Sequence, residues 1–219
     1  MSNGFTVLRR VDSKLHYNFM NIKFKYSHHY EQCLNEKAVA IPRAEILAKI
    51  SAMDRFWKLR GPATEKAFND VTGLSFVKKE IVCYLNSGRT FSDPLTLKIE
   101  NEESMQNNLV HELICVLLMD NEIGFTVGWE TVLERFKNET AATKTQIGIY
   151  AIHLLAATKL FPEWIKNINS YPKSPDYEKS REIVDKTGAD EIVRIIFPKT
   201  ATKTATKTAT KTATKTAVL

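Results

Sequence analysis

The sequence predicts an α+β fold in a single domain, with a small N-terminal β-sheet with helices and a mostly helical C-terminal half. Apolar and polar residues alternate over residues 20–26 and 94–100, which is typical of half-buried strands. From residue 104 onward, apolar residues recur every three or four positions, as in amphipathic helices. No linker divides residues 1–198. Strands and helices followed mostly by helices indicate an α+β domain.

The same two periods, and the residues that interrupt them, predict the individual elements. Gly61–Pro62 is expected to separate two helices, while SGRTFSDP and YSHHYEQC are expected to form turns or loops. Strands are expected at residues 5–11, 20–26, 74–86 and 94–100. Helices are expected at residues 43–59, 63–71, 104–119, 126–138, 143–160, 162–169, 175–187 and 188–196.

The composition is that of an ordinary globular protein, with 43% hydrophobic and 26% charged residues. No apolar run approaches the roughly 20 residues of a membrane span, and the N-terminus does not read as a signal peptide. Three scattered cysteines are too few for a disulfide framework. We therefore expect a cytoplasmic protein without a membrane span.

Residues 199–219 form a low-complexity tail that repeats KTAT and is expected to be disordered. The tail holds five of the lysines behind the net charge of +6, so the rest of the chain is close to neutral. The body therefore gives no reason to expect specific nucleic-acid binding.

The stretch LVHELICVLLMDN, residues 109–121, carries the candidate chemistry. In a helix, His111 and Cys115 project from one face, one turn apart, with Glu112 beside them. Zinc peptidases use the related pattern HExxH: two imidazoles at positions i and i+4 bind Zn²⁺, and the glutamate acts as general base on the metal-bound water. The structural alternative is that His111 is a core histidine, Glu112 is solvated and Cys115 is a small buried apolar residue.

A longer stretch of the chain resembles a zincin-like, gluzincin-type family of uncharacterised microbial proteins, whose helix reads HELIH. The resemblance runs from FWKLRGPATEKAFNDVTGLSFVKKEIVCYL through FSDPLTLKI to VHELICVLLMDN and extends weakly into SPDYEKSREIVDKTGADEIV. It implies a zincin-like fold, in which a strand at the sheet edge binds extended substrate just before the active-site helix. The resemblance is evidence for this fold more than for a reaction. If the site is active, Zn²⁺ is the expected cofactor and peptide hydrolysis the expected reaction.

Cys115 departs from this family pattern because it stands where the second histidine is expected. A thiolate binds zinc firmly, but it makes the metal a poorer Lewis acid and the bound water less acidic. The third ligand has two candidates, Glu134 on spacing and His153 on an apolar helix, with Glu130 one turn before Glu134. Each of the three also has a structural alternative, as a solvated glutamate or a core histidine.

Three functions remain open from the sequence. The first is a zinc-metallopeptidase-like protein with a degenerate site, weakly active or inactive, in which His111, Cys115 and Glu134 or His153 would bind zinc and Glu112 would be the general base. The second is a non-catalytic module that binds an extended peptide or protein on the same fold. The third is an unrelated helical protein in which the His-Glu pair has no function.

Overall fold

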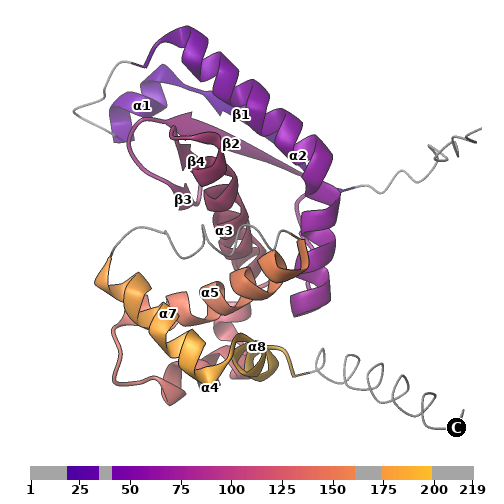
Figure 1. The fold of residues 1–219 in the computed structure, drawn as a ribbon, viewed down its shortest axis with the longest axis vertical. Helices are drawn as coiled ribbons and strands as arrows, with labels where there is room; N and C mark the ends of the chain where they lie inside the picture. The colour runs from indigo at the N-terminus through magenta and orange to yellow at the C-terminus, as the bar shows by residue number, and fades with distance from the viewer. Residues whose placement is uncertain (1–18, 35–40, 161–173, 199–219) are drawn as a thin grey trace, which may run out of the picture.

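The computed structural model describes residues 19–34, 41–160 and 174–198 and confirms the α+β class. Its sheet has four strands, in the order β1-β2-β4-β3. The strands β1, β2 and β4 run parallel, whereas β3 is antiparallel to β4 and forms one edge (Figure 1). The strands are β1 (Asn21–Tyr26), β2 (Glu80–Asn86), β3 (Phe91–Ser92) and β4 (Leu95–Lys98).

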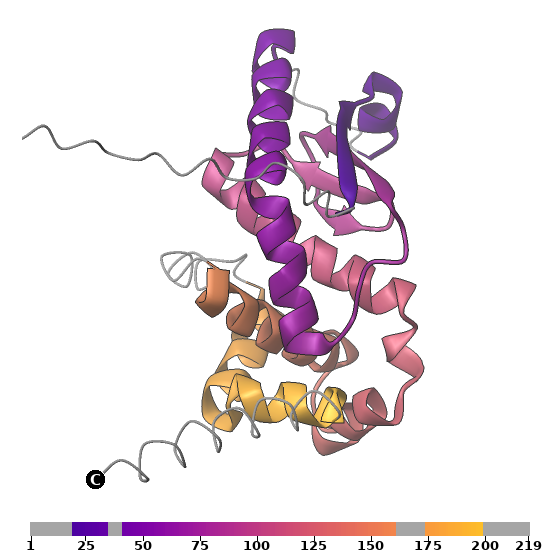
Figure 2. The ribbon, with the colours of Figure 1, turned by 90° about the vertical axis from the view of Figure 1, so that its right-hand side faces the viewer.

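The helices are arranged around the sheet and below it, as the two perpendicular views show (Figures 1 and 2). The sheet, α1 and the first half of α2 form one end of the molecule, α3 runs through the middle, and the later helices form the other end. The helices are α1 (His28–Leu34), α2 (Arg43–Thr72), α3 (Glu102–Asp120), the short 3-10 helix η1 (Ile123–Phe125), α4 (Val127–Arg135), α5 (Ala141–Leu160), α7 (Pro175–Thr187) and α8 (Ala189–Ile196).

The helix α2 corrects the prediction of two helices separated at Gly61–Pro62, because it continues through Pro62. A proline inside a helix costs about 3 kcal/mol. The buried positions nevertheless keep one helical period across it, from Trp57 to Thr64 and Phe68. The Trp57 ring lies so close to Gly61 that a Cβ at that position would be 2.8 Å from Cε2. We infer that burial of this continuous face outweighs the cost of the proline.

The helix α3 carries the candidate motif in a buried stretch. The side chain of Asn101 accepts a hydrogen bond from the backbone N–H of Ser104, so Asn101 is the N-cap and the helix begins two residues before the predicted start at 104. Residues 109–118 are all buried except the partly buried Cys115. The helix packs against α2, α5, β3 and β4.

Other boundaries also differ from the sequence prediction. The strand expected at 74–86 begins only at Glu80, and the segment YSHHYEQC contains α1 instead of a loop. The strand β3 lies within SGRTFSDP, which was expected to be turn only. The strand at 5–11, the helix at 162–169 and the tail 199–219 lie outside the described residues. Within the described ranges, no helix is both long and apolar enough to cross a membrane.

The contact between α4 and α8 gives a first testable prediction. A Cβ added at Gly128 would lie 2.5 Å from the carbonyl oxygen of Ile196 and 2.6 Å from that of Ile195. Since backbone atoms cannot rotate away, Gly128→Ala should lower the free energy of unfolding by about 1–3 kcal/mol, measured by urea denaturation. Gly124→Ala is the control, because a Cβ there meets nothing within 4 Å. Equal stability of the two variants would contradict this packing.

Candidate functional site

A cavity of about 690 Å³ lies where the edge of the sheet meets the helical half of the molecule. Its walls come from β3 and the segment before it, α3, the η1 region, α4, α5 and α7. The lining residues are Thr90, Phe91, Ser92, His111, Glu112, Cys115, Leu118, Met119, Glu122, Gly124, Phe125, Trp129, Thr145, Gln146, Ile149 and Tyr177.

His111, Glu112 and Cys115, three residues of the HELIC motif (residues 111–115), line this cavity together. His111 and Glu112 are buried, with 3% and 9% of their surface exposed, and Cys115 is partly buried. Burial of Glu112 contradicts the structural alternative for this residue, which was a solvated side chain. A buried carboxyl on a cavity wall can interact with a ligand at reduced dielectric, where its charge matters more than it would in water.

His153 and Tyr177 bring two further helices to His111. The ring centroids of His111 and His153 are 5.7 Å apart, so the structure places the second predicted third-ligand candidate beside the motif. The hydroxyl of Tyr177, on α7, lies 3.4 Å from Nε2 of His111. Sequence reasoning missed Tyr177, because a single tyrosine 66 positions away from His111 carries no local signal of this contact.

Glu134, the candidate preferred on spacing, lies elsewhere. It is an exposed residue of α4 and forms an ion pair with Lys137, with 2.9 Å between Oε1 and Nζ. It does not line the cavity, and neither does Glu130. The reason is the rotational phase of α4, which turns Trp129 and Val132 inward and leaves the glutamates on the solvent side.

The donor set does not fit a complete zinc site in this arrangement. Zinc in proteins needs three or four nitrogen, sulfur or oxygen ligands around one point. Within the ranges that the structure describes, no group of three His, Cys, Asp or Glu side chains is placed to hold a metal ion. His111 instead faces the imidazole of His153 and the phenol of Tyr177.

Burial shifts the protonation equilibria of the motif toward the neutral forms. It lowers the pKa of His111 to about 4 and raises the pKa of Glu112 to about 7. Burial, followed by the nearby Glu112, raises the pKa of the Cys115 thiol to about 12. Burial also lowers the pKa of His153, with a further contribution from His111. At neutral pH the cavity wall therefore presents the neutral imidazole of His111, a thiol and a carboxyl near its titration midpoint, with the neutral imidazole of His153 beside His111.

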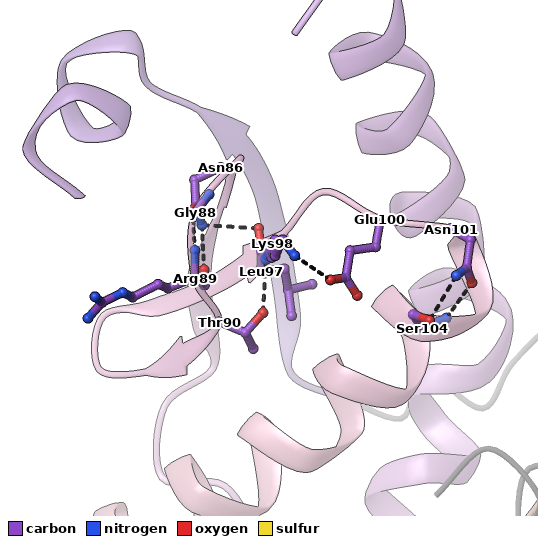
Figure 3. A network of polar contacts seen from close by, with 9 residues as sticks. All are labelled: Asn86, Gly88, Arg89, Thr90, Leu97, Lys98, Glu100, Asn101 and Ser104. Atoms are coloured by element: carbon purple, nitrogen blue, oxygen red, sulfur yellow. Dashed lines mark hydrogen bonds and ion pairs between the residues drawn. The ribbon is translucent and has the colours of Figure 1, made fainter. Parts of the chain in front are cut away.

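The edge strand is held by a network of hydrogen bonds in the preceding turn (Figure 3). The Asn86 side chain accepts from the backbone N–H groups of Gly88 and Arg89, at 2.6 and 2.8 Å, and donates to the carbonyl of Leu97 at 3.2 Å. These bonds fix the turn before β3 against β4. They therefore position Phe91 and Ser92 of β3 at the cavity wall.

A second link in the same network ties the start of β3 to β4. The hydroxyl of Thr90 accepts a hydrogen bond of 2.9 Å from the backbone of Lys98 (Figure 3). Beyond this point, Phe91 pairs with Thr96 and Ser92 pairs with Leu95. On its other side, β3 pairs with no further strand among the described residues. The unpaired edge of a sheet is in general the place where an added strand can pair.

Comparison with known proteins adds nothing to this geometry. No family model matches the chain, and no curated protein or solved structure is significantly similar to it.

The raised pKa of Glu112 gives a prediction for the pH dependence of stability. Folding favours the protonated carboxyl, because its pKa rises from 4.5 to about 7. The stability that depends on this proton is fully present below about pH 4.5 and is lost as the pH rises through about 7. Glu112→Gln removes this loss, so between about pH 5 and 8 the variant should gain up to about 3 kcal/mol relative to the wild type.

Urea denaturation of both proteins across this pH range measures the effect. Glu134→Gln is the matched control, because it makes the same replacement at an exposed carboxylate outside the cavity. If the Glu112→Gln and wild-type curves run parallel from about pH 5 to 8, Glu112 is not the buried acid that the structure describes.

Proposed function

We propose that this chain is a zincin-like, metallopeptidase-related protein whose HExxH site is degenerate, and that its cavity binds an extended peptide or protein segment with little or no hydrolysis. One observation carries the proposal: the HELIC side chains and the edge strand β3 line the same cavity. In the zincin-like arrangement, an edge strand that binds extended substrate borders the helix with the metal-binding motif. The chain combines these two parts in that spatial relation.

The geometry supports binding better than hydrolysis. An edge strand can hold a peptide through main-chain hydrogen bonds, and a neighbouring cavity can take its side chains. A cavity of about 690 Å³ is large enough for one or two side chains together with the backbone between them. Hydrolysis by the zincin route would need a polarising metal, and the described donors do not form a complete site for one.

Zinc-dependent peptide hydrolysis is the second candidate, and the position of His153 favours it. His153 lies beside His111. His111 and Cys115, which is one turn further along α3, line the same cavity. These three residues are the donor set that a zinc ion would use if their side chains turned toward one point. Glu134 is left out of this second candidate, because it lies on the solvent side of α4.

Metal analysis of the wild type and of Cys115→His separates the two candidates. We expect the purified wild type to contain much less than one zinc per chain and Cys115→His to bind about one, because the substitution restores the second imidazole. Cys115→Ala is the control, since it changes the cavity without adding a ligand. Stoichiometric zinc in the wild type, with peptide hydrolysis that a chelator abolishes, would favour the second candidate. No zinc in either protein would count against descent from a zincin site by one substitution.

Peptide binding is tested by filling the cavity. Thr145 of α5 is exposed and lines it, and its hydroxyl only donates to the Ala141 carbonyl one turn earlier. Thr145→Trp should therefore reduce binding to an array of immobilised ten-residue peptides of randomised sequence by about tenfold or more. Thr131→Trp is the matched control, because Thr131 makes the same local bond to Val127 but does not line the cavity. Equal binding by both variants, or no binding by the wild type, would contradict the proposal.

A further inference from the structure

We infer that the cavity selects extended peptides in which a lysine or arginine stands close to a large apolar side chain. This inference rests on the proposed function, because it names the class of peptide that the same cavity would bind. It is carried by the charges of the lining residues and by the apolar side chains exposed at the mouth.

The charged side chains that line the cavity are both acidic. Glu112 lies in the wall formed by α3, and Glu122 lies at the mouth, between α3 and η1. No lysine or arginine is among the lining residues of the described chain. In the same described ranges, no basic side chain forms an ion pair with either carboxyl group. A cation on the ligand would supply the missing countercharge.

The backbone at Glu122 adds a second observation. Its φ of 55° and ψ of 31° lie in the left-handed region, and it is the one non-glycine residue with positive φ in the described part of the chain. Glycine or asparagine would adopt this conformation at lower cost. The turn is held by hydrogen bonds from the N–H of Glu122 to the Met119 carbonyl and from the N–H of Phe125 to the Glu122 carbonyl. A strained position at the cavity mouth therefore carries a carboxylate.

Large apolar side chains stand exposed beside this carboxylate. Phe125 is 87% exposed and Met119 is 50% exposed, and both line the cavity. Val127, two residues after Phe125, is 78% exposed. Further inside, Trp129 and Ile149 continue the apolar wall. An exposed apolar rim around an acidic cavity fits a ligand that is both apolar and positively charged.

Two other occupants could bind the cavity through the same match of charge and apolar surface. The experiments below distinguish them from a separate peptide. The tail 199–219 of this chain is rich in lysine, so it could compete in cis. A second copy of the chain could bury Phe125 in a symmetric contact. We assign the cavity to a separate peptide, because the acidic wall extends inward from the mouth to Glu112, which a flat contact between two copies would not reach.

The experiment uses fluorescein-labelled ten-residue peptides built on alanine, serine and threonine. The readout is the fluorescence anisotropy of the labelled peptide as the full-length protein is added. The first peptide carries one lysine next to one phenylalanine, the second replaces the lysine with glutamate, and the third replaces the phenylalanine with alanine. We expect the first to bind at least about tenfold more tightly than either of the others. Equal affinities for the lysine and glutamate peptides would overturn the inference.

Single substitutions in the protein test its contacts with the lysine and with the phenylalanine of the first peptide. Glu122→Lys should weaken binding of the first peptide about tenfold, and Phe125→Ser should weaken it by a similar factor. Glu130→Lys on the outer face of α4 and Val77→Ser at another exposed apolar position are the controls, and both should stay within about twofold. Glu122→Gly should raise the urea midpoint while weakening binding, so loss of folding cannot explain the result. Unchanged affinity in Glu122→Lys and Phe125→Ser would overturn the inference.

The remaining measurements exclude the other occupants. A variant that ends at Pro198 should bind the first peptide within about twofold of the full chain; tightening by about tenfold or more would make the tail the occupant and overturn the inference. Sedimentation should show a monomer; a dimer that Phe125→Ser dissociates would equally overturn it.

The two proposals fail in different ways. If the lysine and glutamate peptides bind equally and Thr145→Trp weakens both, the selectivity is wrong and the peptide-binding function stands. If none of the three peptides binds at about 1 mM, and the randomised array also shows no binding, both are wrong.

Discussion

One constraint underlies the rest of the structure: α3 is buried over almost its whole second half and still carries an imidazole and a carboxyl among its buried residues. Burying a polar group costs free energy unless it is hydrogen-bonded, and the cost is larger when the group is charged. His111 meets Tyr177 and lies beside His153, and Glu112 is at the cavity wall. A helix that served only as core would be more stable with apolar residues at these two positions. Both side chains line the cavity, so the polar pair lies against a space that a ligand could occupy.

The elements around α3 complete the candidate site. The sheet presents its antiparallel edge strand β3 on one side, and the network around Asn86 fixes the turn that leads into it. On the other side, α5 and α7 bring His153 and Tyr177 to the motif. Because burial lowers the pKa of both imidazoles and raises that of the Cys115 thiol, these groups stay neutral and the wall is suited to hold a ligand by shape and by its carboxylates. A thiolate nucleophile at Cys115 is disfavoured on the same grounds.

The sequence predicted those features that local patterns encode. Alternation located β1 and β4, and the helical period located α3, α7 and α8 and the buried face of α3. It failed where tertiary packing decides. Local sequence predicts a helix end at Gly61–Pro62, because the burial that stabilises α2 through Pro62 is not local. The strand β3 has only two residues and is too short to show a period. The contact of Tyr177 with His111 and the outward phase of Glu134 depend on how helices distant in sequence pack together.

The most direct test of the central claim is to map where a peptide contacts the protein, by the change in backbone amide NMR signals on adding the lysine–phenylalanine peptide. We expect the changes to cluster on Phe91 and Ser92 of β3, on α3 from His111 to Met119, and on the turn from Glu122 to Phe125, because these segments surround the cavity. Changes confined to α2, or to the end of the sheet away from β3, would contradict the claim that the cavity beside α3 is the functional site.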